Sequence, residues 1–344
     1  VGVEKAFDSR LRGTPGKRVA PASRFVRGEP TLVEEPTAGS DVTLTVDARL
    51  TNTAARALRT SAIRSGAVVV LDPRDGALLA SISSPAIDPD KLARGTLDDA
   101  GDRPWVDRTR KLAHAPGSLV KPFYLLAALS HGHDGAHTCT GSMSFGKRTY
   151  RCTRAHGRVD AAHAVSSSCN VFFFETGVEL GSDALNDVLH RAGMLGPIGM
   201  PVGEPEGSFR SAATSTRRPH RRMADTLNAS IGQGELRVSP LAVAVAYGAL
   251  ANGGRVLTPR VLATDETVER GTLPARDALA SVRAQLVARS RELARDHEPL
   301  PGDVAATFGA ARSLRDGMAR DDHWFAAFAP ADAPRVVVVV FGEE

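Results

Sequence analysis

A serine and a lysine separated by two residues are the pair in this chain with the clearest chemical potential. They are Ser118 and Lys121, within the segment 115–123, whose sequence is APGSLVKPF. If a helix begins at the serine, the two side chains share one face, and a lysine that loses its proton there can act as a general base toward the hydroxyl. The same spacing also fits a solvated helix start, so its meaning depends on the surrounding residues.

The flanking residues predict that a helix does begin at this serine. Pro116 and Gly117 interrupt whatever precedes them, and residues 123–129 form an apolar run typical of a buried helix. Pro122 is tolerated only in a first turn, where backbone N–H groups have no intrahelical partner. We therefore expect Ser118 in the first turn, where those N–H groups and the helix dipole favour developing negative charge.

The composition is that of an ordinary globular protein. Of the 344 residues, 42% are hydrophobic and 24% are charged, which suits one large domain with a smaller appendage. The net charge of +4 and the basic run 217–222 are features that nucleic-acid-binding proteins share. However, Pro219 and the serines and threonines before the run predict a solvated loop, so we expect no nucleic-acid partner. We find no nucleotide, nicotinamide or flavin motif and expect no cofactor.

Three cysteines leave several chemistries open: Cys139, Cys152 and Cys169. Cys139 and Cys152 bracket a predicted hairpin at 140–151, whose ends a disulfide would fasten in an oxidising compartment. The same two residues with His156, and with His137 as a further candidate, would instead form a zinc site. Because no paired short-spacing signature is present, we favour a disulfide or free thiols. Cys169 is expected to be a small buried apolar residue.

The patterning divides the chain into two parts. Residues 1–40 are rich in proline and glycine and have little apolar periodicity, which predicts an extended segment without a core of its own. Residues 41–344 form the predicted main domain. It opens with a strand-like alternation at 42–46 and a helical pattern from Asp47 through Leu58.

Two strongly apolar hairpins are predicted at opposite ends of the main domain. The first joins 67–71 to 77–82, and the second joins 323–328 to 336–341. Each is connected by a turn rich in aspartate and proline. Such apolar strands suit a sheet that is covered on both faces by the helices between them.

Matches in the same order along nearly the whole chain make it resemble the transpeptidase region of penicillin-binding proteins. Residues 2–16 are similar to class B members of that family. Further matches follow at 44–47, 66–85, 116–123, 168–173, 230–235, 239–241, 251–254 and 323–330. The resemblance implies an α/β fold of the α+β type, shared with serine β-lactamases, in which helices flank a five-stranded antiparallel sheet and the nucleophile stands beside an edge strand.

Carried over residue by residue, the resemblance implies four catalytic residues. Ser118 would attack the D-Ala-D-Ala carbonyl of a peptidoglycan stem peptide and form an acyl-enzyme, with Lys121 as its base. Ser168 would relay a proton between the lysine and the leaving group, and Asn170 would orient the substrate. In an extended loop these last two side chains point to one side, while Cys169 points away.

The third motif departs from the family pattern. Where the family has Lys-Thr-Gly-Thr on the edge strand, this chain has Thr307, Phe308, Gly309 and Ala310. Gly309 still permits close approach of a substrate, and the backbone N–H of Ala310 would join that of Ser118 in an oxyanion hole. Loss of the charge and of both hydroxyls would cost roughly two or more orders of magnitude in acylation. Arg312 or Arg315 is a candidate to replace the charge.

The ends of the sequence also differ from the family. Members usually carry an amino-terminal membrane anchor and a longer pedestal, and a final helix follows the strand that here ends near Phe341. We therefore expect residues 1–40 to be a pedestal remnant, one face of the sheet to be partly uncovered, and membrane contact to run only through the missing anchor. The implied location is periplasmic, at the extracytoplasmic face of the inner membrane.

Three functions remain open on these grounds. The first is a D,D-transpeptidase that takes peptidoglycan stem peptides and β-lactams, with a glycosyltransferase as a candidate partner. The second is a catalytically impaired homologue that serves as a scaffold in cell-wall synthesis, favoured by the altered third motif. The third is a serine β-lactamase or β-lactam sensor.

Overall fold

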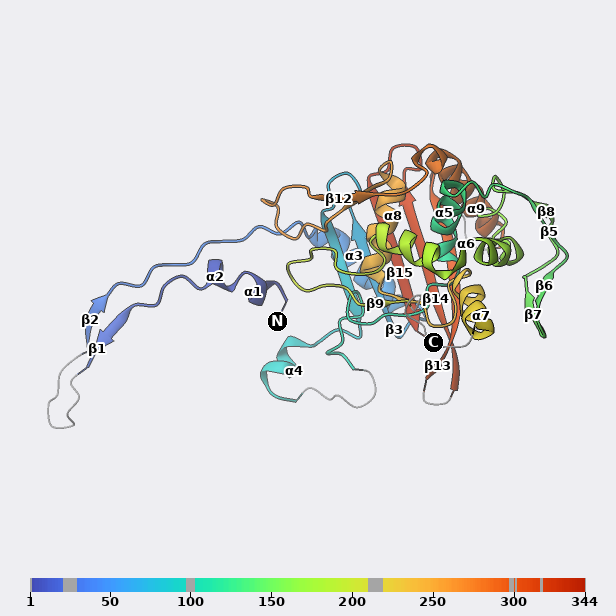
Figure 1. Ribbon diagram of the computed structural model, residues 1–344. Coiled ribbons are helices and arrows are strands. Elements are labelled where there is room, and N and C mark those ends of the chain that lie inside the picture. The colour runs from blue at the N-terminus through green and yellow to red at the C-terminus, as the bar shows by residue number, and fades with distance from the viewer. Residues whose placement is uncertain are drawn as a thin grey trace.

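The computed structural model describes residues 2–20, 30–96, 103–209, 219–296, 300, 302–315 and 318–343. A long extended amino-terminal segment projects to one side of a domain built from helices and strands (Figure 1). This segment contains α1 (Val3–Ala6), α2 (Asp8–Leu11) and the paired strands β1 (Lys17–Val19) and β2 (Thr31–Glu34). None of its described residues is buried, so it has no core of its own.

The centre of the domain is a five-stranded antiparallel sheet with the strand order β13-β14-β15-β3-β4. Its strands are β3 (Ser65–Leu71), β4 (Leu78–Ser84), β13 (Ala305–Arg315), β14 (Met318–Ala329) and β15 (Val336–Glu343). Both predicted hairpins form, β3 with β4 and β14 with β15. The predicted fold class is confirmed, and β13 lies at one edge of the sheet.

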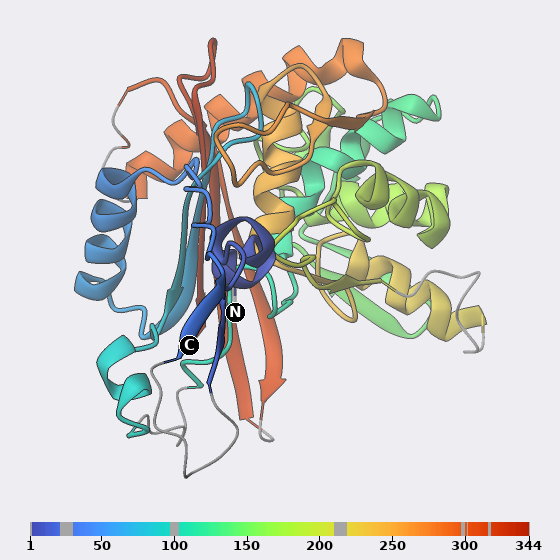
Figure 2. The ribbon, with the colours of Figure 1, turned by 90° about the vertical axis from the view of Figure 1, so that its left-hand side faces the viewer.

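Helices lie on both faces of this sheet (Figure 2). On one face is α3 (Ala48–Thr60), whose first turn is capped by the Asp47 carboxylate and whose Leu58 packs against Val68 and Val70. On the other face are α5 (Lys121–Ser130) and α8 (Pro240–Ala251), and every residue of α8 is buried. The alternate valines of β15 on the α3 face stay only half-buried, so this face is covered in part among the described residues.

The other described helices are α4 (Pro89–Ala93), α6 (Asn170–Arg191), α7 (Pro219–Ala229), α9 (Leu279–Asp296) and the 3-10 turns η1 (Gly117–Val120) and η2 (Arg276–Ala278). Short strand pairs are β5 (His137–Cys139) with β8 (Gly157–Val159), β6 (Ser142–Phe145) with β7 (Arg148–Arg151), β9 (Gly207–Ser208) with β10 (Arg237–Val238), and β11 (Arg255–Leu257) with β12 (Glu269–Thr272). No helix in the described part of the chain combines the length and apolar character needed to cross a membrane.

Two local predictions are wrong. The basic run predicted as a loop is described only from residue 219, and from there it is helical, because Pro219 is the first residue of α7 and proline is well suited to that position. Residues 42–46 do not form a strand but make a single bridge, between Leu44 and Leu262. The reason is that the partner of this segment is the loop 260–263 rather than a strand.

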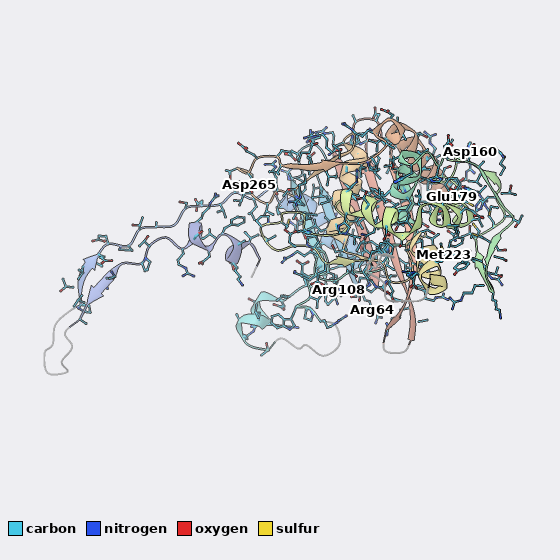
Figure 3. The ribbon with its side chains drawn as sticks, in the orientation of Figure 1. Arg64, Arg108, Asp160, Glu179, Met223 and Asp265 are labelled. Carbon is cyan, nitrogen blue, oxygen red and sulfur yellow. The ribbon has the colours of Figure 1, made fainter. Side chains whose placement is uncertain are left out.

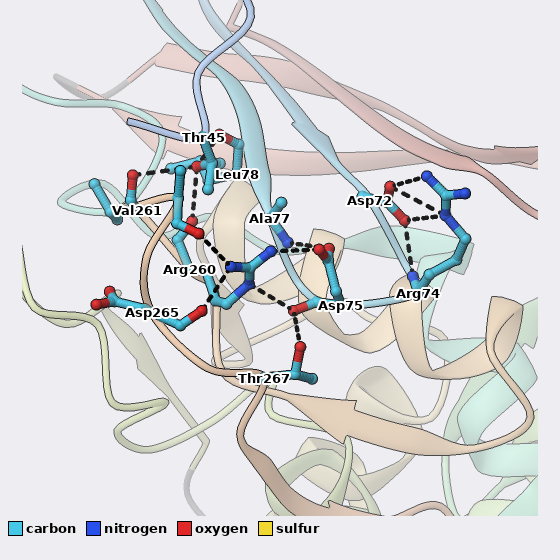
Figure 4. A network of polar contacts seen from close by, with 11 residues as sticks. Thr45, Asp72, Arg74, Asp75, Ala77, Leu78, Arg260, Val261, Asp265 and Thr267 are labelled. Atoms are coloured by element: carbon cyan, nitrogen blue, oxygen red, sulfur yellow. Dashed lines mark hydrogen bonds and ion pairs between the residues drawn. The ribbon is translucent and has the colours of Figure 1, made fainter. Parts of the chain in front are cut away.

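Polar contacts tie that loop to the edge of the sheet (Figure 4). Thr45 donates its hydroxyl to the carbonyl oxygen of Leu78, at 2.8 Å. Arg260 binds both the carboxylate and the carbonyl oxygen of Asp75, in the turn between β3 and β4, and donates to the carbonyl oxygen of Asp265 at 2.7 Å. These bonds satisfy backbone carbonyl groups in a region without regular pairing.

A buried polar cluster fixes the chain that leads to Ser118. Arg108, labelled in Figure 3, donates from Nε to the hydroxyl of Ser65 at 2.8 Å. The Nδ1 atom of His114 lies 3.0 Å from a carboxylate oxygen of Asp322 on β14. Because Arg108, His114 and Asp322 are buried, these contacts replace lost water contacts and hold the segment against the sheet.

Candidate active site

Ser118 lies in η1, a short 3-10 turn that leads directly into α5. Pro122 is the second residue of α5, so the predicted helix start is confirmed. Two side chains from distant segments hold the turn in place. The hydroxyl of Tyr247 donates to the carbonyl oxygen of Leu119 at 3.0 Å, and the indole of Trp324 donates to that of Ala115 at 2.9 Å.

Three glycines allow the backbone around Ser118 to pack against β13 and against the loop after α7. The backbone N–H of Gly117 donates to the carbonyl oxygen of Gly232 at 2.9 Å. A Cβ on Gly117 would lie 2.6 Å from the carbonyl oxygen of Ala310, and a Cβ on Gly232 or Gly309 would overlap the backbone of residues 116–117. Only glycine fits these contacts, which bring the nucleophile beside the edge strand.

The ammonium group of Lys121 is buried and joins the two predicted motifs. It donates to the carbonyl oxygen of Ser168 at 2.8 Å, to the Oγ of Ser168 at 3.0 Å and to the Oδ1 of Asn170 at 2.7 Å. The Oγ of Ser168 lies 3.3 Å from the Oγ of Ser118. The structure therefore brings the four predicted catalytic residues together.

The environment of Lys121 prepares it to accept a proton. The pKa of this lysine is lowered to about 7, chiefly because burial disfavours the charged form. Cys152 and Cys169 act in the opposite direction, and the positive charge of Arg289 adds a smaller lowering effect. A neutral amine is therefore available near neutral pH, as a general base requires.

The segment that holds Ser168 and Asn170 differs from the extended loop that the sequence predicts. Ser168 adopts a positive φ of 48°, and α6 begins immediately afterwards at Asn170. The two side chains still meet at one group, because both accept a hydrogen bond from Lys121. A left-handed serine is strained, and its contacts with buried Lys121 help to maintain it.

The edge strand β13 presents backbone donors beside Ser118. The carbonyl oxygen of Ala310 accepts a hydrogen bond from the side chain of Gln233 at 2.8 Å, so this residue faces away from β14. In an antiparallel strand the N–H and C=O of one residue point to the same side. The N–H of Ala310 therefore also points away from β14, toward the helix start at Ser118.

The side chains of the third motif, Thr307 and Phe308 among them, supply no positive charge to the site. Thr307 is buried, and Phe308 stacks on His323 with 5.9 Å between ring centroids. Arg312 does not replace the missing charge, because its guanidinium is paired with Asp321 at 2.9 Å and it does not line the cavity. The side chain of Arg315 lies outside the described residues.

A cavity of about 630 Å³ opens over the nucleophile. Its walls include Ser118, Ser168 and Asn170, which the sequence predicts to be catalytic, together with Phe308 and Ala310 of β13. Three arginines also line it: Arg154, Arg289 and Arg295. The cavity is therefore open to an acyl substrate and has a basic wall.

The cysteines form a cluster next to this cavity. All three are free thiols, which is one of the two alternatives that the sequence favours, and Cys139 and Cys152 are not joined by a disulfide. The ligand atoms of Cys139, Cys152, His156 and Cys169 lie within 4.8 Å of one another. The Nδ1 of His156 is 3.6 Å from the sulfur of Cys139 and 3.5 Å from that of Cys152. Tetrahedral zinc, with bonds of about 2.3 Å to sulfur and about 2.0 Å to nitrogen, places such atoms about 3.6 Å apart, so the cluster fits zinc.

Two details of the cysteine prediction need correction. Cys169 is buried as expected, but it belongs to the cluster, and no short spacing in the sequence signals this. His137 does not belong to the cluster, because its Nε2 lies 3.7 Å from the carboxylate of Glu179 on α6 (Figure 3). The sulfur of Cys152 accepts the backbone N–H of Asn170 at 3.1 Å, so the cluster is joined to the catalytic motif.

Electrostatics within the cluster favour one thiolate. Hydrogen bonds from the thiol of Cys169 and from the backbone N–H groups at the start of α6 lower the pKa of Cys152 well below its usual range. The same hydrogen bond raises the pKa of Cys169. A thiolate at a helix start is a good ligand for a cation.

Comparisons with known proteins agree with this geometry. The chain matches the family profile of the penicillin binding protein transpeptidase domain over residues 66–344. It is 30% identical over 285 residues to the peptidoglycan D,D-transpeptidase MrdA of Acinetobacter baumannii. The aligned region covers 76% of this chain and 41% of that protein. The chain thus spans less than half the length of the curated relatives it matches first.

Solved structures show the same similarity. The D,D-transpeptidase domain of a peptidoglycan glycosyltransferase from Eggerthella lenta has a TM-score of 0.79 and 26% identity, over 99% of this chain and 82% of that one. Pseudomonas aeruginosa PBP2, in complex with WCK 5153, has a TM-score of 0.77 and 28% identity, over 90% and 75% of the two chains. With a profile match over residues 66–344, and with Ser118, Lys121, Ser168 and Asn170 in contact, the chain belongs to the penicillin-binding protein transpeptidase domain family.

Proposed function

We propose that this domain is a peptidoglycan D,D-transpeptidase that acts through an acyl-enzyme on Ser118. The observation that supports this most directly is the chain of contacts from Ser118 through the hydroxyl of Ser168 to Lys121. A lysine whose pKa is about 7 can take the proton of the nucleophile through this chain at neutral pH. The relatives that are named peptidoglycan D,D-transpeptidases support the same reaction.

In the proposed acylation, the Oγ of Ser118 attacks the carbonyl carbon between the two terminal D-alanines. Its proton passes by way of Ser168 to Lys121, and the oxyanion is held by the backbone N–H groups of Ser118 and Ala310. The C–N bond then breaks, and the proton returns through Ser168 to the departing D-alanine amine. The amine of a second stem peptide then attacks the ester carbonyl and gives a proton to Lys121; the C–O bond to Ser118 breaks, and that proton returns through Ser168 to the serine as the cross-link forms. Asn170, which already accepts a bond from Lys121, orients the stem peptide.

The same chemistry sets the proposed biological context. β-Lactams would acylate Ser118, because their strained amide presents the same carbonyl to the nucleophile. Peptidoglycan is cross-linked outside the cytoplasmic membrane, so we place the reaction at the extracytoplasmic, periplasmic face, in cell-wall synthesis and cell shape. A glycosyltransferase that supplies uncross-linked strands is the proposed partner.

A covalent label tests the function and separates it from its alternatives. A fluorescent penicillin should label the wild-type protein and Ser166→Ala, whose hydroxyl bonds to His163 and does not line the cavity, but not Ser118→Ala. No labelling of the wild type at high probe concentration would leave the scaffold as the surviving function. Labelling followed by rapid release of hydrolysed drug would identify a β-lactamase.

We also propose that Cys139, Cys152, His156 and Cys169 bind one zinc ion with a structural role. The distances and the thiolate at Cys152 support this, and the four protein ligands would leave no open position for a substrate. Bound zinc would cross-link the hairpin that carries the first two cysteines to the start of α6. It would thereby hold Asn170 at Lys121.

A further inference from the structure

Arg289 is the least exposed arginine in the wall of the catalytic cavity. It belongs to α9, which packs against β13, and its side chain is 22% exposed. Its NH1 atom donates to the carboxylate of Glu292 at 3.1 Å. Its Nε atom is buried and has no hydrogen-bond partner within the described part of the chain. A guanidinium has five N–H donors, so one ion pair leaves an edge of the group available.

The charge of Arg289 acts in the same region as the catalytic lysine. Arg289 and Ser118 line the same cavity, so a ligand bound over the nucleophile shares that space with the guanidinium. In the same direction, though less than burial, the positive charge of Arg289 lowers the pKa of Lys121.

The other cationic residues near the site are less suited than Arg289 to binding an anionic group of a ligand. Arg154 and Arg295 line the cavity but are exposed, so water weakens their attraction for an anion. Arg312 is occupied by Asp321. Thr307 is neutral and buried, and it stands where a lysine of the third motif would be.

We propose that Arg289 binds the terminal carboxylate of the stem peptide, and the matching carboxylate of a β-lactam, and so replaces the cation that β13 lacks. This inference rests on the proposed transpeptidase function, since it concerns the substrate of that reaction. The Nη atom that Glu292 leaves free is the donor that would reach the carboxylate first. The Nε atom is closed to solvent in this structure, and it would become the second donor of the pair when the side chain turns toward the ligand.

A comparison of two ligands tests the inference. We would measure the second-order rate of acylation with benzylpenicillin and with its methyl ester, which lacks the negative charge. The wild type should prefer the acid by roughly two orders of magnitude, and Arg289→Gln should remove most of that preference, as expected for a lost charge-assisted pair. Arg289→Lys should keep part of it, because lysine retains the charge but not the paired donors.

Controls separate this role from an effect on folding or on Lys121. Arg291→Gln changes an exposed arginine of the same helix that does not line the cavity, and its rates should equal those of the wild type. If Arg289→Gln slows both ligands equally, Arg289 does not bind the carboxylate and the inference is overturned. If the wild type reacts with neither ligand, the proposed function fails and this inference fails with it. If Arg289→Gln still prefers benzylpenicillin over the methyl ester as strongly as the wild type does, only the inference about Arg289 is overturned.

Discussion

The hydroxyl of Ser168 lies between Lys121 and Ser118, 3.0 Å from the Nζ of the lysine and 3.3 Å from the Oγ of the nucleophile. Lys121 and Ser118 are only three residues apart in sequence, yet these hydrogen bonds link them through a residue about fifty positions away. The hydroxyl of Ser168 is thus in the position that the proposed proton path requires.

Replacement of Ser168 by alanine tests that path. We expect the acylation rate with a penicillin to fall by about 10²-fold or more, because the relay is removed while Ser118 and Lys121 stay in place. Stopped-flow or gel-based labelling measures the rate, and Ser166→Ala serves as the matched control two residues away. A Ser168→Ala rate close to that of the wild type would mean that Lys121 deprotonates Ser118 without the relay.

The acylation rate should also depend on pH in one direction. Lys121 is protonated below its pKa of about 7 and cannot act as a base there, so the rate should rise through that pH and level off above it. Removal of the positive charge in Arg289→Gln should move the midpoint to higher pH, since that charge lowers the pKa of Lys121. A rate that stays constant from pH 5.5 to 8.5 contradicts the role of Lys121 as the base.

Gly232→Ala should disrupt the packing of the nucleophile turn. Its new Cβ would overlap the carbonyl group of Gly117, whereas a Cβ on Gly146, which also has positive φ, meets nothing within 4 Å. Both changes carry backbone strain of roughly 1–2 kcal/mol, so the difference between them isolates the clash. We expect Gly232→Ala to lower the thermal midpoint further and to slow acylation, while Gly146→Ala labels normally. Equal thermal shifts would show that the contact is not tight.

Zinc removal should loosen the catalytic motif. Purified protein should contain about one zinc per chain, and Cys152→Ser should lose it, as should protein treated with a strong chelator. Loss of the metal should lower the thermal midpoint, because the hairpin and α6 are no longer cross-linked. His137→Ala removes a histidine outside the cluster and should keep its zinc. A chelator that changes neither metal content nor thermal midpoint argues against a metal site.

Much of the site follows from local sequence patterns, because the forces involved act within a few residues. Pro116, Gly117 and Pro122 specify a helix start, and the structure has that start. The two apolar hairpins likewise form where alternation and turn residues predict them. The strand at 42–46 fails for the converse reason: its pattern is local, but strand formation needs a partner strand, and only a loop is available.

The residues around Ser118 are enough to predict a helix start with Lys121 on the same face, and the third motif alone reveals that the edge strand lacks its lysine. Neither pattern predicts what surrounds these residues. The packing of the folded chain brings Cys169 to two other cysteines and His156, and it places Arg289 in the cavity wall from a helix far along the chain. Such contacts depend on how distant elements pack together, and residue spacing along the chain contains no signal for them.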